Sequence, residues 1–205
     1  MTGTRDFNAA AATWDEEPGR VRMADSVARA IRETIRLSPE MDVLDFGCGT
    51  GLLTLRLQPF VRTITGIDTA PGMLAVLEKK VRDQDLSNVR AQLVDVEHGE
   101  VPAGKFDSVV SSMTFHHIRD VGPVIGRLAA LIRPGGCLAI ADLDSDEGKF
   151  HDSNAGVFHF GFDRCAMMKQ FEAAGLCSIR NRTAAIVTKP SGTFTVFLMT
   201  GEKPR

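Results

Sequence analysis

Three glycines at every second position, Gly47, Gly49 and Gly51, separate a short apolar run from a segment with helical periodicity. Glycine at such a turn allows backbone angles that other residues avoid, and it lets the main chain approach a ligand without a Cβ in the way. The helix that follows would present its free N–H groups and its positive dipole end to the same place. The pattern predicts a socket for a nucleotide-like ligand at the carboxyl end of a parallel sheet.

Two carboxylates make the predicted socket more specific. Asp68 ends a second apolar run, where its carboxylate could accept both hydroxyls of a ribose, and Asp95 ends a third run, where it could reach an adenine amino group. A single Asp after a strand is often only a turn former or a helix cap. The ordered succession of three strand ends, each with an acid or a glycine, favours binding.

Four histidines are candidate catalytic residues. His116 and His117 follow the fourth predicted strand, and His151 and His159 lie in a later loop. Imidazole exchanges a proton near neutral pH, so each could act as a general base toward a nucleophile. The alternative is that the pair His116 and His117 is structural or only lines a pocket. Carboxylates lie near His151 and His159, but the spacing matches no standard metal site, so none is predicted.

Alternating strands and helices would position these groups. Periodicity predicts strands at 41–46, 63–68, 88–94, 106–111 and 136–141, and helices at 20–37, 52–58, 70–82, 121–132 and 163–174. A last pair of strands, 177–182 and 194–200, flanks a turn at 189–192. We therefore expect an α/β fold, with a doubly wound, mostly parallel seven-stranded sheet and an antiparallel hairpin at its C-terminal edge.

The motifs, in this order, resemble those of class I S-adenosylmethionine-dependent methyltransferases of the small-molecule type. The resemblance spans 41–141 and is carried by Leu44-Asp45-Phe46-Gly47-Cys48-Gly49-Thr50-Gly51, Gly66-Ile67-Asp68, Val94-Asp95-Val96, Phe106-Asp107, Ser111 to His117 and Arg133-Pro134-Gly135-Gly136. A nicotinamide site would more often show Gly-x-Gly-x-x-Gly, whereas here the third glycine comes one residue early.

The resemblance implies that S-adenosylmethionine is the cofactor and that a small-molecule acceptor receives the methyl group. The cofactor-binding residues that it implies are Asp45, Gly47, Cys48, Gly49, Gly51, Asp68, Thr69, Met73, Asp95, Val96 and Ser112. Trp14 lies in a segment that often folds over the cofactor in this family, although it could equally anchor the first helix. Arg20 and Arg22 are further candidates, for the cofactor carboxylate.

We expect a single domain over residues 1–205, because this length can bury one sizeable core. Residues 1–40 would form an N-terminal helical cap, with 1–13 poorly ordered. The insertion 142–162 carries four phenylalanines, too many for a solvated loop. We expect it to be a lid over the acceptor side, with His151 or His159 facing the pocket. The alternative is a surface loop whose phenylalanines pack on the sheet.

Composition and charge bear on which partners and which cellular location we expect. The net charge of −2 suggests no bulk binding to nucleic acid or to an anionic membrane, and no apolar run approaches the ~18 residues that span a bilayer. The four cysteines show no CxxC spacing, and residues 1–17 lack an apolar signal core, so a cytoplasmic location is expected. Monomer and homodimer both stay open. The rival functions are a nicotinamide-dependent oxidoreductase and a non-catalytic partner protein that binds the cofactor.

Overall fold

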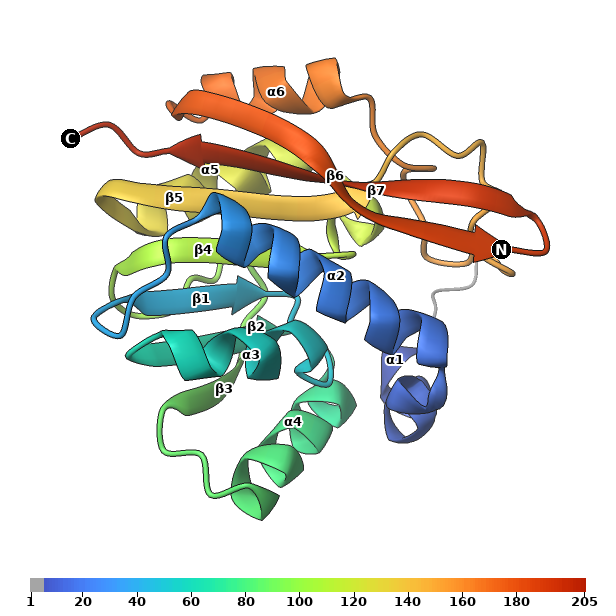
Figure 1. Cartoon of the computed structure of the whole chain (residues 1–205), viewed down its shortest axis with the longest axis horizontal. Coiled ribbons are helices and arrows are strands. Elements are labelled where there is room, and N and C mark those ends of the chain that lie inside the picture. Colours follow the sequence, from blue (N-terminus) through green and yellow to red (C-terminus); the bar gives the residue numbers. More distant parts are fainter. Residues whose placement is uncertain (1–5) are drawn as a thin grey trace.

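Seven strands form one mixed sheet in the computed structural model, which describes residues 6–205 (Figure 1). In chain order they are β1 (Asp42–Phe46), β2 (Thr63–Asp68), β3 (Val89–Leu93), β4 (Phe106–Ser112), β5 (Ile132–Leu143), β6 (Cys177–Lys189) and β7 (Gly192–Glu202). The order across the sheet is β3-β2-β1-β4-β5-β7-β6. Neighbours among β1 to β5 pair parallel, whereas β7 pairs antiparallel with β5 and β6. The predicted sheet with its antiparallel edge hairpin is confirmed.

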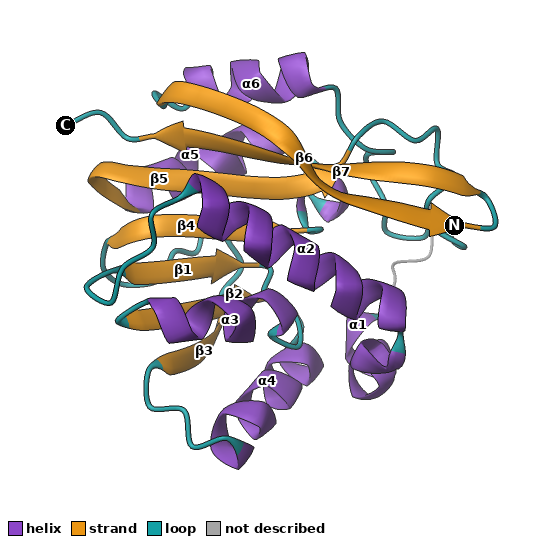
Figure 2. Ribbon diagram, viewed as in Figure 1, coloured by secondary structure: helices purple, strands orange, loops and turns teal. Residues whose placement is uncertain are grey.

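Helices cover both faces of this sheet (Figure 2). They are α1 (Phe7–Ala10), α2 (Pro18–Thr34), α3 (Leu52–Leu57), α4 (Pro71–Asp83), α5 (Val121–Leu131) and α6 (Arg164–Ala173), with 3-10 turns η1 (Ala11–Glu16), η2 (Gln58–Phe60) and η3 (Phe115–His117). One apolar cluster joins α2, α3 and α4 to one face, and a second joins α5 and α6 to the other. Successive strand residues point to opposite faces, so Val43 belongs to the first cluster and Leu44 to the second.

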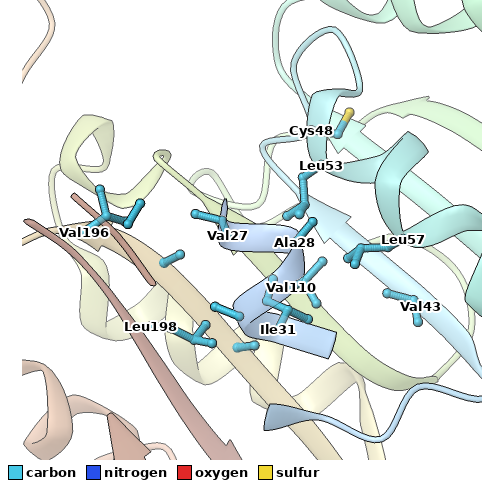
Figure 3. Packing of buried hydrophobic residues seen from close by; sticks show 14 of the residues in the cluster. Val27, Ala28, Ile31, Val43, Cys48, Leu53, Leu57, Val110, Val196 and Leu198 are labelled. Carbon is cyan, nitrogen blue, oxygen red and sulfur yellow. The ribbon is translucent and has the colours of Figure 1, made fainter. Parts of the chain in front are cut away.

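The first cluster fixes α2 beside the strands that carry the site. Figure 3 shows Val27 and Ile31 of α2 together with Val110 of β4 and Leu198 of β7. Val27 and Ile31 are fully buried, one helical turn apart, so a single stripe of α2 contacts the sheet. This packing holds the start of α2, and the segment before it, near the carboxyl ends of the strands.

The switch point of the sheet lies between β1 and β4, because the chain runs from β1 to β2 on one side and places β4 on the other. Phe46 of β1 lies opposite Ser111 of β4, and the Ser111 hydroxyl donates a hydrogen bond to the Phe46 carbonyl at 2.8 Å. In open α/β sheets, ligands bind in the crevice at this point. The glycine turn after β1 therefore stands where a ligand is expected.

Several predicted boundaries were wrong. The segment 6–13, expected to be poorly ordered, forms α1 and the start of η1, and Asp6 caps α1 by accepting from the Ala9 N–H at 3.0 Å; residues 1–5 lie outside the described part. The hairpin strands pair up to Lys189 and Gly192, so the first continues well past 182 and the second begins slightly before 194. Asp142 and Leu143, assigned to the insertion, end β5 instead. Within residues 6–205, no helix is both long and apolar enough to cross a membrane.

Candidate cofactor and acceptor site

A cavity of about 430 Å³ opens at the carboxyl ends of β1, β2 and β4, next to the switch point. This volume lies within the range of about 300–1,000 Å³ of small-molecule sites. The predicted cofactor-binding residues that line it are Asp45, Gly47, Cys48, Gly49, Asp68, Thr69, Met73, Asp95, Val96 and Ser112. The remaining predicted residue, Gly51, does not line the cavity.

The three glycines of the turn all have left-handed backbone angles, with φ of 69° at Gly47, 54° at Gly49 and 84° at Gly51, but their surroundings differ. A Cβ at Gly47 would lie 2.2 Å from the Thr114 hydroxyl oxygen, and one at Gly51 would lie 2.4 Å from a Leu77 methyl carbon. A Cβ at Gly49 would meet nothing closer than 4.0 Å. Gly47 and Gly51 are therefore required by packing, and Gly49 leaves room for a ligand.

The Asp68 carboxylate is held at the end of β2 by main-chain donors. It accepts hydrogen bonds from the Gly49 N–H at 2.8 Å and from the Ala70 N–H at 2.9 Å, one on each oxygen. Burial raises the pKa of Asp68, and these hydrogen bonds oppose the rise. Each oxygen keeps a lone pair beside the cavity, so the group can accept two further hydrogen bonds from a diol.

Asp45 is a second buried carboxylate in the cavity wall, only 1% exposed. It accepts a hydrogen bond from the Thr54 hydroxyl at 2.6 Å. Burial raises the pKa of Asp45 to about 7, and the charge of Asp68 adds to the rise. Near neutral pH, both protonation states of Asp45 are therefore populated, and a cationic ligand would favour the ionised form.

Asp95 lies at the outer wall of the cavity, beyond the end of β3. Its carboxylate accepts a hydrogen bond from the His98 main-chain N–H at 3.1 Å and lies 2.8 Å from the Nδ1 atom of His98. The Asp95 N–H donates to the Glu100 carboxylate at 2.8 Å. These local contacts fix the turn and leave Asp95 partly exposed.

The segment before α2 and the first turn of α2 form another part of the wall, through Phe7, Trp14 and Arg20. The Arg20 guanidinium donates to the Trp14 carbonyl at 3.0 Å and stacks 3.8 Å from the centre of the indole ring. Trp14 thus lines the cavity and also packs on α2, so both interpretations of this residue agree with its position. Arg22 is not among the lining residues.

Polar contacts tie this segment to the socket. Asp15 accepts a hydrogen bond from the Thr50 hydroxyl at 2.6 Å and pairs with the Lys80 ammonium, which also donates to the Thr50 carbonyl at 2.7 Å. The Asn8 side chain accepts from the Gly72 N–H at 2.7 Å. The N-terminal segment is therefore attached to the glycine turn and to α4.

Of the four candidate histidines, His117 is the one that lines the cavity. Its Nδ1 atom lies 2.7 Å from the Gly156 carbonyl oxygen. A carbonyl only accepts, so Nδ1 carries the proton and Nε2 of the neutral ring keeps its lone pair. Burial lowers the pKa of His117 to about 4, and positive charge on His116 acts in the same direction. His117 is therefore neutral at pH 7.

His116, a predicted catalytic candidate, lies behind this wall and outside the cavity, at 1% exposure. Its Nδ1 atom is 2.7 Å from the Asp142 carboxylate, which also accepts from the His116 N–H at 3.3 Å and from the Leu143 N–H at 2.7 Å. Burial would raise the pKa of Asp142, yet His116 and these donors hold it below its usual value. The His116 ring thus binds the buried Asp142 carboxylate and does not face a methyl acceptor in the cavity.

The expectation that His151 or His159 faces the cavity was wrong. Nε2 of His159 lies 2.9 Å from the Ile118 carbonyl oxygen, and its ring centre is 5.0 Å from that of Phe162. The His151 ring lies 4.9 Å from His116 and 5.0 Å from Phe150. Both rings pack between the loop and the region of η3, and neither is among the residues that line the cavity. Within residues 6–205, no group of three or more His, Cys, Asp or Glu side chains is placed to hold a metal ion.

The loop after β5 reaches the cavity through other residues, Gly156 and Phe158. Phe150 and Phe162 are buried as expected, but Phe158 is 44% exposed and Phe160 is 48% exposed. Two of the four rings are therefore exposed, contrary to the expectation that four phenylalanines are too many for a solvated loop. Phe158 combines exposure with a place in the cavity wall, as expected for a side chain at an entrance.

The residues singled out from the sequence do not include the lining residues Phe7, Thr114, Gly156 and Phe158, although the last two lie in the predicted lid. Phe7 is the one aromatic residue in the small and polar stretch 1–13, which could have indicated a contact. Thr114 and Gly156 carry no such signal, because loop contacts alone place them in the wall.

Comparison with known proteins agrees with this geometry. Residues 43–136 match the sequence profile of a family described as methyltransferase domain. The chain is 36% identical over 151 residues to an uncharacterized methyltransferase of Schizosaccharomyces pombe, covering 66% of this chain and 53% of that protein. It is 32% identical over 165 residues to a malonyl-[acyl-carrier protein] O-methyltransferase of Paenibacillus, covering 76% and 59%. The chain thus spans about half the length of the curated relatives it matches.

A solved structure extends the likeness over the whole fold. The methyltransferase in complex with the Trm112 activator of Haloferax volcanii superposes with a TM-score of 0.79 at 18% identity, covering 99% of this chain and 100% of that one. The open position at Gly49 and the free lone pairs of Asp68 fit the nucleoside part of S-adenosylmethionine. By its motifs, its fold and its relatives, the chain belongs to the class I S-adenosylmethionine-dependent methyltransferases.

Proposed function

We propose that the protein transfers a methyl group to a hydroxyl oxygen of a small-molecule acceptor. The observation that carries this proposal is the neutral His117 ring, whose Nδ1–H is taken by the Gly156 carbonyl. Its Nε2 is left to accept a hydrogen bond from a hydroxyl, to orient the oxygen and to take its proton. The similarity to a protein named an O-methyltransferase supports oxygen as the acceptor atom.

The cofactor would be held by the residues at the strand ends. We assign Asp68 to the ribose hydroxyls, Asp95 to the adenine amino group, and Gly49 to the close approach of the main chain. When bound, S-adenosylmethionine supplies an electrophilic sulfonium methyl. The protein then has mainly to place an oxygen in line with that methyl, and proximity of this kind accounts for about 7–11 kcal/mol of a barrier.

The acceptor would lie on the side of the cavity formed by His117, Gly156 and Phe158. We propose that the loop carrying Gly156 and Phe158 acts as its lid. Apolar and aromatic residues dominate this side, with Phe7, Met113 and Ile118 also in the wall. Such a surface favours an uncharged, largely apolar body that carries the reacting hydroxyl.

A panel of small phenols, aliphatic alcohols, amines and thiols, followed by release of S-adenosylhomocysteine, tests the acceptor class. Hydroxyl compounds are expected to react, and a clear preference for amines or thiols would contradict the proposal.

A matched pair of substitutions tests His117 as the base. In His117→Gln the side-chain amide lies near the former Nε2 and its oxygen can still accept a hydrogen bond there. In His117→Asn the amide lies near the former Nδ1 and can only donate to the Gly156 carbonyl. We expect His117→Asn to lose about 10²–10⁴-fold in kcat, as for loss of acid–base catalysis, and His117→Gln to lose less. Unchanged turnover in His117→Asn would exclude the base.

A thermal-shift comparison separates the rival functions. S-adenosylhomocysteine is expected to raise the melting temperature at concentrations where NAD has no effect, because only a ligand that binds the folded state stabilises it. A larger shift with NAD would favour the oxidoreductase, and binding without turnover of any panel compound would favour the non-catalytic partner protein.

A further inference from the structure

His116 is the centre of a hydrogen-bonded group directly behind the cavity wall. Its side chain and its main-chain N–H both contact the Asp142 carboxylate, at 2.7 and 3.3 Å. Both residues are almost completely buried, at 1% and 0% exposure. Asp142 stands at the end of β5, which is anchored on both sides by β4 and β7. Beside the buried Phe115, this carboxylate thus ties η3, which carries both histidines, to the end of β5.

The carbonyl group of His116 holds the loop after β5. It accepts hydrogen bonds from the Phe158 N–H at 2.9 Å and from the His159 N–H at 3.2 Å. Nε2 of His159 adds a contact of 2.9 Å to the Ile118 carbonyl, just beyond η3. The stretch from Gly156 to His159 is thus bound to η3, and its place over the cavity depends on where His116 stands.

The stretch from Gly156 to His159 also contacts His117. The Gly156 carbonyl, two residues before Phe158, is the acceptor that fixes the protonated nitrogen of His117. If the loop moved, this acceptor would leave, and the neutral ring could carry its proton on either nitrogen. Only the form with the proton on Nδ1 offers a lone pair at Nε2. The tautomer of His117 is therefore set by contacts that lead back to His116 and Asp142.

We propose that Asp142 and His116 are positioning residues, which hold the loop 156–159 and through it the reactive tautomer of His117. This inference rests on the proposed role of His117 as the proton acceptor. Neither Asp142 nor His116 lines the cavity, so neither touches the reacting atoms. Their loss is expected to leave cofactor affinity within about threefold. Turnover should fall about 10–100-fold, because a small misplacement of a catalytic group costs up to about 10²-fold.

Two substitutions of His116 form a matched pair. His116→Asn places an amide donor near the former Nδ1 and can keep the bond to Asp142, whereas His116→Gln places its amide near the former Nε2 and loses that bond. The readout, in protein saturated with S-adenosylhomocysteine, is the imidazole ¹⁵N spectrum of His117, assigned by comparison with His117→Ala, together with the hydrogen exchange of the Phe158 and His159 amides. These measurements need no acceptor.

In the wild type and in His116→Asn, we expect the ¹⁵N signals of a neutral ring with the proton on Nδ1 and slow exchange of both amides. In His116→Gln, and in Asp142→Ala if it folds, we expect signals that move toward the average of the two tautomers and amide exchange at least ten times faster. Unchanged signals and unchanged exchange in His116→Gln would overturn the proposal. If instead these changes occur but His117→Asn keeps full turnover, the positioning inference stands and the proposed base fails.

Discussion

The two sides of the cavity are built in different ways. The cofactor side consists of strand ends and one turn, where Asp68 accepts from main-chain N–H groups and Gly49 offers bare backbone. The proposed acceptor side consists of a 3-10 turn, a long loop and an N-terminal segment, which meet through side chains such as His117 and Phe158. The sheet fixes the first side directly, whereas the second depends on contacts between segments distant in sequence. The first is suited to one unvarying ligand, and the second can change its ligand by changing loops.

The glycines on the cofactor side differ in what requires them: packing requires Gly47, whereas room for the ligand requires Gly49. Gly47→Ala should lower the free energy of unfolding by about 2–5 kcal/mol, because a left-handed residue costs about 1–2 kcal/mol and overpacking against Thr114 adds about 1–3 kcal/mol. Gly49→Ala should cost only the first amount, while its methyl group enters the cavity and weakens cofactor binding. Denaturant titration and calorimetry measure the two effects, and equal destabilisation by both substitutions would refute the division.

Substitution of Asp68 tests cofactor binding with less effect on the fold than the glycine substitutions. Asp68→Ala should weaken S-adenosylmethionine binding by about 1.5–3 kcal/mol for each ribose hydroxyl that loses a charged acceptor. Asp95→Ala is the comparison, since its carboxylate is partly exposed and already contacts His98; its loss should be smaller. Isothermal calorimetry gives both affinities. An Asp68→Ala variant that folds and binds normally would remove the ribose assignment.

Phe158 and Phe160 are a matched pair on the acceptor side, because they are exposed to nearly the same extent, 44% and 48%, and only Phe158 lines the cavity. Phe158→Ala should raise the KM of the acceptor about five- to tenfold, equivalent to about 1 kcal/mol of apolar contact at 25 cal/mol per Å². Phe160→Ala should leave that KM unchanged, and both should leave cofactor affinity unchanged. Equal effects of the two would show that the loop has no defined acceptor side.

The smallest expected effect concerns Asp45. Its pKa of about 7 in the folded protein exceeds the ordinary value of 3.8. Below about pH 4 the carboxyl is protonated in both the folded and the unfolded protein, so its raised pKa has no effect on the free energy of unfolding. As the pH rises from 4 to 7 this free energy falls progressively, and Asp45→Asn should reduce that pH dependence. Cationic S-adenosylmethionine favours the ionised carboxylate, so binding at pH 7 should release protons. Calorimetry in buffers of different ionisation enthalpy measures that release, and proton uptake would contradict it.

The difference between the two sides also explains what could be predicted from sequence. Gly49, Asp68 and Asp95 follow apolar runs, and a local pattern is enough to place the ends of parallel strands together. His116 and His117 are neighbours of the same type, and no local signal tells which one lines the cavity. That choice depends on Asp142 and Gly156, which lie 26 and 39 residues from their partners.

Other errors have the same origin. Phe7 looks isolated in a polar stretch, yet its ring lies 5.9 Å from that of Trp14 and 5.0 Å from that of His117. The hairpin continues to Lys189 through the apolar run Ala184-Ala185-Ile186-Val187, which lacks the alternation of polar and apolar residues that indicates a strand. Both features are held by distant or main-chain partners, which periodicity does not record.

The attachment of the N-terminal segment has a consequence for the timing of the catalytic cycle. Phe7 and Trp14 form part of the cavity wall, and the contacts of Asp15 with Thr50 and Lys80 hold that wall in place. If S-adenosylhomocysteine leaves past this wall, its residence time depends on how often the N-terminal segment detaches. Product release of this kind limits the turnover of many enzymes. Salt weakens the partly exposed pair of Asp15 and Lys80, so we expect faster release of S-adenosylhomocysteine at higher ionic strength.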